Sequence, residues 1–332
     1  MKNSVDAENY SKIYKQQLRI IEKRLAKLLV GKEPESLYEP CEYILQAGGK
    51  RLRPFLVLIS AKASSGNYNQ VYNAALAVEI LHNFTLVHDD IMDNSMMRRG
   101  RATLHNKYDL STAILAGDSL IALAYQSLFK DCKDDAKKIF ATFTQGVVEV
   151  CEGQSYDKEF ELRKLVSIPE YKKMIYKKTA ALTEMCCSIG AQIAGADNVQ
   201  LKALKNYGKN LGMAFQIHDD LLDITANQHE FGKMIGSDLI EGKKTYLFLR
   251  ALEKAKGLDK KAFLKVIDRK GIKQNEVLKY KELYFKLGVV QDAEREIVKY
   301  TKLALENLTA IKNKEAREIM NWLANYLTYR NK

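Results

Sequence analysis

Proline and glycine are scarce in this sequence, with 4 prolines and 18 glycines among 332 residues. Because turns depend on these residues, their scarcity disfavours a fold of many short strands and favours long helices. Runs of 18 or more apolar residues are missing too, and the N-terminus reads Met-Lys-Asn-Ser-Val-Asp rather than a basic and then apolar signal. We therefore expect a soluble, cytoplasmic protein with no stable membrane insertion.

Cysteine pairs at metal-binding or redox spacing are also lacking. The five cysteines are odd in number and none forms a Cys-x-x-Cys pair. This pattern disfavours a disulfide framework or a thiolate zinc site, and indicates buried small hydrophobic residues in a reducing compartment. The positions are Cys41, Cys132, Cys151, Cys186 and Cys187.

Positive charge exceeds negative charge, with 53 Lys and Arg against 41 Asp and Glu and a formal net charge of +12. The excess is spread along the chain, and no aromatic-basic module typical of nucleic-acid binding accompanies it. We therefore expect no nucleic-acid partner. An anionic small substrate or an anionic membrane surface could use the charge, while lysine-rich solvated helix faces, such as 254–281, account for most of it.

Apolar residues recur at helical spacing along most of the chain. The pattern predicts helices and few breaks between them, and no internal segment resembles a flexible linker. The expected helices span 5–29, 35–46, 54–63, 70–91, 111–129, 134–152, 169–195 and 199–224, and about four amphipathic helices follow from 247 to 332.

Two similar acidic segments stand 130 residues apart. Residues 86–93 read Leu-Val-His-Asp-Asp-Ile-Met-Asp, and residues 216–223 read Gln-Ile-His-Asp-Asp-Leu-Leu-Asp. On a helix, the first and last aspartates of each triplet are four residues apart and share a face. A single copy could be an acidic patch at a helix end, but two copies in apolar surroundings would be costly without cations. Such oxygen clusters suit magnesium, which completes its shell with water and substrate phosphate.

Basic residues accompany these acidic segments. Residues 48–54 read Gly-Gly-Lys-Arg-Leu-Arg-Pro, a glycine turn before a helix start, which is a plausible anion site because helix N-termini are positive. A second basic group, Arg98-Arg-Gly-Arg101, follows the first acidic segment and could hold phosphate oxygens directly. His82 lies seven residues before Asp89, on the same side of the expected helix, and is either a ligand or a satisfied core residue.

With these motifs in order from Gly48 to Thr245, the sequence resembles the trans-prenyl diphosphate synthases, which elongate isoprenoid diphosphates. A terpene cyclase would be expected to have a single aspartate motif of this kind and no Gly-Lys-Arg-Leu-Arg segment. The resemblance implies an all-α, single-domain isoprenoid synthase fold over residues 1–332, with about ten core helices around a deep central cavity. It also implies a homodimer that acts on small isoprenoid diphosphates.

The resemblance further implies roles for individual residues. Asp89, Asp93 and Asp219 would hold three magnesium ions, with manganese as an alternative metal, and Asp90, Asp220 and Asp223 would support them. The residues implied to contact or line the site of the allylic diphosphate are Arg98, Lys178, Thr179, Gln216, Lys233 and Lys243. Those implied to bind isopentenyl diphosphate are Lys50, Arg53, His82 and Arg99, with Gly49 and Phe215 beside them.

Product length is expected to depend on the helix before the first acidic segment. Phe84 lies five residues before Asp89, about 7.5 Å along a helix axis, and the small Thr85 is next to it. A single aromatic residue here resembles archaeal-type geranylgeranyl diphosphate synthases and favours a twenty-carbon product. Farnesyl diphosphate or a longer product is the alternative, and Phe84 could instead be ordinary core packing while another wall sets the length.

Two small departures from the family pattern concern loop shape. Ala102 stands where proline is usual, and Tyr246-Leu247 replaces Leu-Pro. A non-catalytic partner subunit would typically lose aspartates or the basic segment, whereas this chain has both. The sequence therefore indicates an active prenyltransferase.

Overall fold

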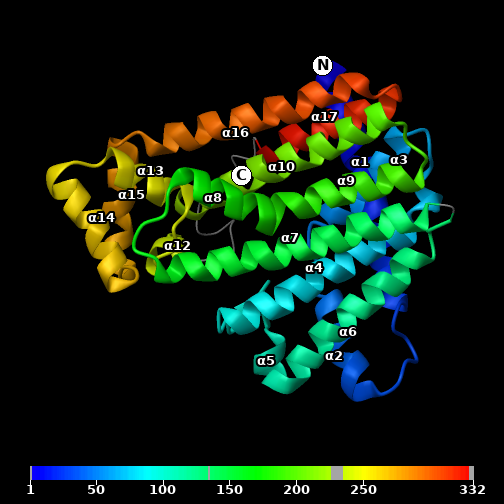
Figure 1. Cartoon of the computed structure of the whole chain (residues 1–332), viewed down its shortest axis with the longest axis horizontal. Helices are drawn as coiled ribbons and strands as arrows, with labels where there is room; N and C mark the ends of the chain where they lie inside the picture. The colour runs from blue at the N-terminus through cyan, green and yellow to red at the C-terminus, as the bar shows by residue number, and fades with distance from the viewer. Residues whose placement is uncertain (1, 134, 226–234, 329–332) are drawn as a thin grey trace. The chain divides into compact units, whose positions relative to one another are not determined.

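The computed structural model describes residues 2–133, 135–225 and 235–328, which are almost entirely helical (Figure 1). This confirms the predicted all-α fold. Within these ranges the only strands are β1 (Met97–Arg98) and β2 (Arg101–Ala102), an antiparallel pair in which Met97 faces Ala102 and Arg98 faces Arg101.

By contacts between Cα atoms the chain divides into two compact units. One unit comprises Met1–Phe143, Met185–Lys205 and Thr309–Trp322, and the other comprises Thr144–Glu184, Asn206–Leu308 and Leu323–Lys332. The expectation of a single domain over residues 1–332 stays a prediction.

The helices in the N-terminal part of the chain are α1 (Lys2–Lys27), α2 (Glu35–Leu45), α3 (Leu52–Ala63), η1 (Tyr68–Gln70), α4 (Tyr72–Met92), α5 (Leu104–Lys107) and α6 (Leu110–Phe129). Those that follow are α7 (Ala136–Leu162), α8 (Ile168–Ile175), η2 (Tyr176–Ala180), α9 (Ala181–Ile193), α10 (Asn198–Thr225), α12 (Ser237–Ile240) and α13 (Tyr246–Lys254). The last are α14 (Gly257–Arg269), η3 (Gln274–Glu276), α15 (Val277–Lys286), α16 (Val289–Glu306), η4 (Asn307–Ala310) and α17 (Lys314–Thr328).

Helix α4 is the central element of the first unit, and it lies alongside α6 and α3 (Figure 1). Most of its side chains are buried. Its N-terminus is fixed by Asp131, whose Oδ2 accepts from the N–H of Ala74 over 2.8 Å and whose Oδ1 accepts from Asn73 Nδ2 over 2.7 Å. This anchoring determines where the opposite end of α4 presents its aspartates.

Helix α6 is long and apolar enough to cross a membrane by length and composition alone, and 44% of its most apolar window is buried. It begins with Asp109 as N-cap, whose Oδ1 accepts from the N–H of Thr112 over 2.9 Å. Its contacts with α4, α2 and α5 mark it as a packed helix of the first unit.

The second unit is built around an aromatic core. Phe263 on α14 stacks on Tyr284 of α15 at 5.9 Å and meets Phe248 of α13 edge-on at 5.9 Å. Helix α8 starts with a capping box in which Ser167 and Glu170 each bind the other's backbone N–H. These contacts fix the elements that carry the second set of polar residues.

The structure corrects two predicted helices. The predicted helix over 169–195 is interrupted by the π-helical turn η2, because hydrogen bonds there skip one more residue, which the apolar pattern does not reveal. The predicted helix over 134–152 continues to Leu162, because Gly153 does not end it. One cysteine expectation was also wrong: Cys41, Cys186 and Cys187 are buried, but Cys151 is exposed.

Candidate active site

The first aspartate cluster lies at the C-terminal end of α4. Asp89 and Asp90 are in the last turn, and Asp93 follows as C-cap, its N–H donating to the carbonyl of Asp89 over 2.8 Å. Asp89 is half-buried and Asp93 is exposed, whereas Asp90 is buried. Two of the three carboxylates, those of Asp89 and Asp93, are therefore accessible to a ligand, and their role as metal ligands stays a prediction.

Asp90 anchors the β-hairpin that follows α4. Its Oδ1 accepts from Arg98 Nε over 2.7 Å, and its backbone carbonyl accepts from the N–H of Ser95 over 2.9 Å. Burial raises the pKa of the Asp90 carboxyl, while the Arg98 guanidinium opposes that shift. Arg99 and Gly100 form the tight two-residue turn of this hairpin, with φ +52° and +73°. Arg98 precedes the turn at the end of β1.

The structure brings together four of the five residues predicted to bind isopentenyl diphosphate. Arg53 Nη1 lies 3.1 Å from His82 Nε2, and Arg99 Nη1 donates to the carbonyl of Gly48. The guanidinium of Arg99 lies against Gly49, where a Cβ would come within 2.9 Å of Nη1. Lys50 is the fifth residue; its side chain is exposed, and its carbonyl accepts from Tyr14.

His82 is uncharged in this cluster. Burial comes first among the causes that lower its pKa well below 6.5, followed by the guanidinium groups of Arg53 and Arg99. Since Arg53 can only donate, Nε2 of His82 accepts and the ring proton lies on Nδ1, 3.4 Å from Thr85 Oγ1. The imidazole therefore orients Arg53 without adding charge.

Arg51 has a role that the sequence did not reveal. It adopts φ +46° as N-cap of α3, and its side chain turns inward. Nη1 forms an ion pair with Glu79 Oε1 at 2.6 Å, and Nη2 donates to the carbonyl of Leu45 over 2.8 Å. Both side chains are almost fully buried, so this pair fixes the backbone between Lys50 and Arg53.

The second aspartate cluster lies near the C-terminal end of α10. Asp219 is half-buried, while Asp220 and Asp223 are buried. Asp220 Oδ2 accepts from Tyr171 Oη over 2.5 Å and from the N–H of Tyr246 over 3.0 Å, and Gln216 Nε2 donates to Oδ1 over 3.1 Å. Burial raises the pKa of Asp220 to about 6, and these donors oppose the shift.

Asp223 organises the segment that follows α10. Its carboxylate accepts from Ser237 Oγ over 2.6 Å and from the N–H of Asp238 over 3.2 Å. Burial and the neighbouring Asp223 raise the pKa of Asp238 to about 8, while Lys243 lowers it. Lys243 Nζ lies 2.6 Å from Glu241 Oε2 and 4.0 Å from Asp238 Oδ1. The predicted residue Lys233 lies outside the described residues.

The π-helical turn η2 presents the predicted residues Lys178 and Thr179. Thr179 Oγ1 donates to Gln216 Oε1 over 2.8 Å, linking the turn to α10. Lys178 Nζ donates to Asp157 Oδ2 over 2.5 Å, an acidic partner on α7 that the sequence reasoning missed. On the same helix, both side-chain polar atoms of Gln154 are buried without a hydrogen-bond partner among the described residues.

Comparisons with known proteins identify the family of this chain. The family model for polyprenyl synthetases matches residues 34–284. The chain belongs to the polyprenyl synthetase family. The geranylgeranyl pyrophosphate synthase of Geoglobus acetivorans is 41% identical over 324 residues, which cover 96% of this chain and 99% of the relative.

Solved structures agree with this assignment of the family. The geranylgeranyl pyrophosphate synthetase of Pyrococcus horikoshii superimposes with a TM-score of 0.89 at 36% identity, covering 98% of this chain and 99% of the other. A polyprenyl synthase of Caulobacter crescentus, complexed with calcium and isoprenyl diphosphate, has a TM-score of 0.89 at 26% identity, covering 98% of each chain. The fold of this chain is therefore the all-α isoprenoid synthase fold.

The aspartates of this polyprenyl synthetase fit a hard divalent cation that shares its shell with substrate. No three Asp, Glu, His or Cys side chains of residues 2–133, 135–225 and 235–328 come together as a closed metal cage. Magnesium held by one or two carboxylates and completed by diphosphate and water needs no such cage. Burial raises the pKa of Asp220 and Asp238, and for Asp238 the neighbouring Asp223 and Asp220 add to the shift; a nearby cation would oppose it.

Phe84, the predicted chain-length residue of this polyprenyl synthetase, lies on α4 one turn before His88. Its ring is buried and meets the His88 imidazole edge-on, with centroids 4.6 Å apart. Thr85 is half-buried, and its hydroxyl donates to the carbonyl of His82 over 2.8 Å. The role of both residues in product length stays a prediction.

Proposed function

We propose that this prenyltransferase condenses isopentenyl diphosphate head-to-tail with an allylic diphosphate to give geranylgeranyl diphosphate. The observation that carries the proposal is the set of polar residues, in a chain 41% identical to a geranylgeranyl synthase over nearly its full length. The set comprises an arginine-histidine cluster beside Gly49 and two aspartate clusters, each of which keeps at least one carboxylate that is not buried. A non-catalytic partner subunit would not need all of these groups.

Isopentenyl diphosphate is held by the cluster around His82. Arg53, Arg99 and Lys50 supply positive charge for its phosphate oxygens, and neutral His82 keeps Arg53 in place through the 3.1 Å contact. The absence of a side chain at Gly49 allows Arg99 to lie against the backbone. This arrangement holds the nucleophilic double bond in a fixed position, which supplies much of the rate enhancement in two-substrate reactions.

The allylic diphosphate is held by the aspartates and by a second set of basic residues. Asp89, Asp93 and Asp219 would ligate magnesium, or manganese in its place, and the bound metal stabilises negative charge on the departing diphosphate. Arg98, Lys178 and Lys243 add direct charge to the diphosphate, and Thr179 and Gln216 hold the turn that carries Lys178. Lys233 is proposed to join them.

The reaction proceeds by ionisation, condensation and proton loss. The allylic carbon–oxygen bond breaks, and both of its electrons leave with the diphosphate. The double bond of isopentenyl diphosphate then donates its electrons to the allylic cation, which forms the new carbon–carbon bond and a new cation. That cation loses a proton to the released diphosphate, which restores a double bond. No side-chain nucleophile is required, but water must be excluded from the cation.

We propose a cytoplasmic homodimer. Support comes from apolar side chains that α6 leaves exposed: Leu110 is 54% exposed and Leu115 is 60% exposed. A partner subunit that covers them would remove apolar surface from water. Light scattering of the full chain tests this assembly, with twice the monomer mass expected.

The function is tested by the products that the full chain makes from labelled isopentenyl diphosphate and farnesyl diphosphate with magnesium. A twenty-carbon product is expected, and absence of any prenyl product with every allylic primer would overturn the proposal. A Phe84→Ser variant is expected to give longer products, because it removes the aromatic ring at this level of α4 and so leaves room for a longer prenyl chain. An unchanged product length in that variant would place the limiting wall elsewhere while leaving the reaction intact.

A further inference from the structure

The helical pair α14 and α15 carries a large share of the chain's positive charge. Residues 257–286, which span both helices, contain nine Lys and Arg against four Asp and Glu, a net charge of +5, whereas the whole chain has +12. None of these residues takes part in the proposed chemistry. The excess is therefore a property of this surface rather than of the active site.

The two helices form an antiparallel hairpin with an aromatic inner side. Phe263 of α14 packs against Tyr280 and Tyr284 of α15, at 5.6 and 5.9 Å between ring centroids. Tyr280 Oη donates to the carbonyl of Ala262 over 3.0 Å, and Lys286 Nζ forms an ion pair with Asp259 at 2.7 Å. Because these contacts fill the space between the two helices, the side of each helix that is turned away from the other faces solvent.

The solvent-facing side of α14 combines basic residues with a large apolar residue. On α14, Leu258, Lys261, Lys265 and Arg269 follow one another at spacings of three and four residues and so share one face, and all four are exposed. Leu258 is 82% exposed. On α15, Leu278 and Phe285 are also exposed, at 66% and 47%, but they lie on the side of that helix that faces away from α14.

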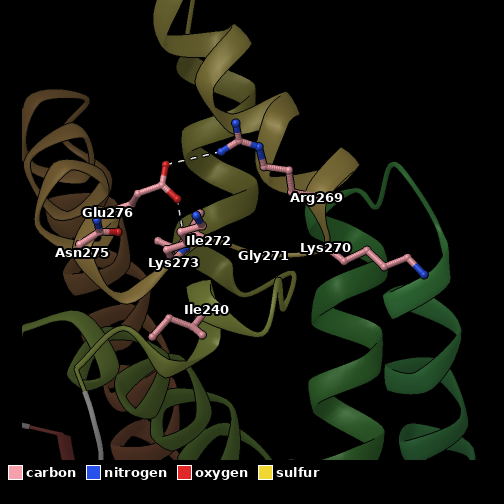
Figure 2. Close-up of a pocket in the computed structure, with 8 residues that line it drawn as sticks. All are labelled: Ile240, Arg269, Lys270, Gly271, Ile272, Lys273, Asn275 and Glu276. Atoms are coloured by element: carbon pink, nitrogen blue, oxygen red, sulfur yellow. Dashed lines mark hydrogen bonds and ion pairs between the residues drawn. The ribbon is translucent and has the colours of Figure 1, made fainter.

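A pocket of about 550 Å³ lies where the hairpin turns. Arg269, Lys273 and Asn275 line it with donors and Ile240 supplies an apolar side, while the Lys270 side chain extends away from them (Figure 2). The one carboxylate that lines it belongs to Glu276, whose Oε1 lies 3.6 Å from Arg269 Nη1 and whose Oε2 accepts from the N–H of Lys273 over 3.0 Å. The pocket is therefore a basic recess with room for a phosphorylated headgroup.

We propose that the outer face of α14, defined by Leu258, Lys261, Lys265 and Arg269, is a docking surface for anionic phospholipid membranes. Basic residues on a helical surface are attracted to anionic lipid headgroups, and an exposed leucine side chain beside them inserts at the boundary with the acyl chains. Nucleic acid would use the charge but not the apolar residue. A second copy of the same surface would bring two positively charged faces together, which repel.

The test is flotation of the full chain with vesicles of phosphatidylcholine alone or with added phosphatidylglycerol. We expect the chain to bind the vesicles that contain phosphatidylglycerol and not those of phosphatidylcholine alone, and we expect added salt to weaken this binding. The variant Lys261→Glu with Lys265→Glu is expected to bind more than about thirtyfold more weakly, since each basic residue near an anionic surface contributes about a factor of five. The variant Leu258→Ser is expected to bind about tenfold more weakly, whereas Leu278→Ser, on the side of α15 that faces away from α14, is expected to bind as the natural chain does.

A matched control separates this surface from the net charge of the chain. Lys137→Glu with Lys302→Glu changes the charge equally at exposed positions on α7 and α16, and it is expected to leave binding unchanged. Equal loss in both double variants, or no flotation of the natural chain, would overturn the proposal. So would duplex DNA that binds as tightly as the anionic vesicles and depends on Lys261 and Lys265.

Folding and activity provide the remaining controls. Both double variants are expected to keep the helical circular dichroism and the melting temperature of the natural chain, because the exchanged lysines are exposed. If the glutamate variants have a lower melting temperature than the natural chain, the same lysines are replaced by glutamine instead. The glutamine variants give the same comparison with half the change in charge. Membrane binding is measured without substrate, so its failure would leave the proposed reaction untouched.

Discussion

Arg51 lies between the two basic residues Lys50 and Arg53, yet its own side chain points into the core. The 2.6 Å ion pair with Glu79 is almost completely buried. Removing one member leaves the other charge buried and unpaired. Replacing both members by apolar side chains of similar volume leaves no unpaired charge. The pair therefore fixes the loop mainly by penalising any displacement that separates the charges.

We expect Arg51→Met to destabilise the chain by about 3–5 kcal/mol in urea unfolding. It should also raise the KM for isopentenyl diphosphate more than it lowers kcat, because the flanking basic residues lose their fixed backbone. The double variant Arg51→Met with Glu79→Leu should recover most of the stability. Additive losses in the double variant would contradict this account.

His82 predicts a specific pH dependence of stability. Its pKa in the folded chain lies well below 6.5, so between those values the unfolded chain binds a proton that the folded chain does not. The free energy of unfolding therefore falls as the pH falls below about 6.5. A His82→Gln variant should lose less stability than the natural chain between about pH 7.5 and 5.5, measured by urea unfolding at both values. Equal losses would show that the imidazole does not titrate in this way.

At the scale of elements, the π-helical turn η2 depends on close approach of two neighbouring helices. A Cβ at Gly153 of α7 would lie 2.2 Å from the backbone nitrogen of Lys178, and a Cβ at Gly212 of α10 would lie 2.6 Å from the Cα of Ala180. Side chains at either position would push the turn away. The two glycines thus allow the turn to present Lys178 and Thr179.

Gly153→Ala is expected to lower kcat/KM for the allylic diphosphate and to cost about 1–3 kcal/mol of stability through overpacking. The KM for isopentenyl diphosphate should change less, because its cluster lies in the other unit of the chain. Ser155→Ala, at an exposed position on the same helix, serves as control. Steady-state kinetics with each substrate varied in turn measure the difference, and an unaltered Gly153→Ala enzyme would refute the role of this contact.

Helical periodicity predicted α4, α6 and α10 to within two residues, because their apolar faces are continuous. It did not predict η2, since a single extra residue in a helix leaves the apolar pattern almost unchanged. The aspartates and the basic segment were visible as motifs. Partners such as Glu79 for Arg51 and Asp157 for Lys178 were not, because each pair is more than 20 residues apart and is created only by helix packing.

At the scale of the whole molecule, the metal is expected to serve the substrate rather than the fold. The described residues hold no closed cage of metal-ligating side chains, and their core is formed by packed helices and aromatic rings. A ligand stabilises a folded protein only when its concentration exceeds its dissociation constant, so a cation that binds weakly without diphosphate should hardly change the melting temperature. A cation completed by diphosphate oxygens should bind more tightly.

We therefore expect chelation with EDTA to abolish prenyl transfer while leaving the helical circular dichroism intact. Magnesium alone should change the melting temperature little, inorganic diphosphate alone should also change it little, and the two together should raise it by several degrees, on the order of 2–4 °C per kcal/mol for a chain of this size. Asp219→Asn should reduce the joint effect, whereas Asp268→Asn, at an exposed position on α14, should not. Unfolding on chelation would mean that the metal is structural, and a full effect of magnesium without diphosphate would mean that the carboxylates form a preassembled site.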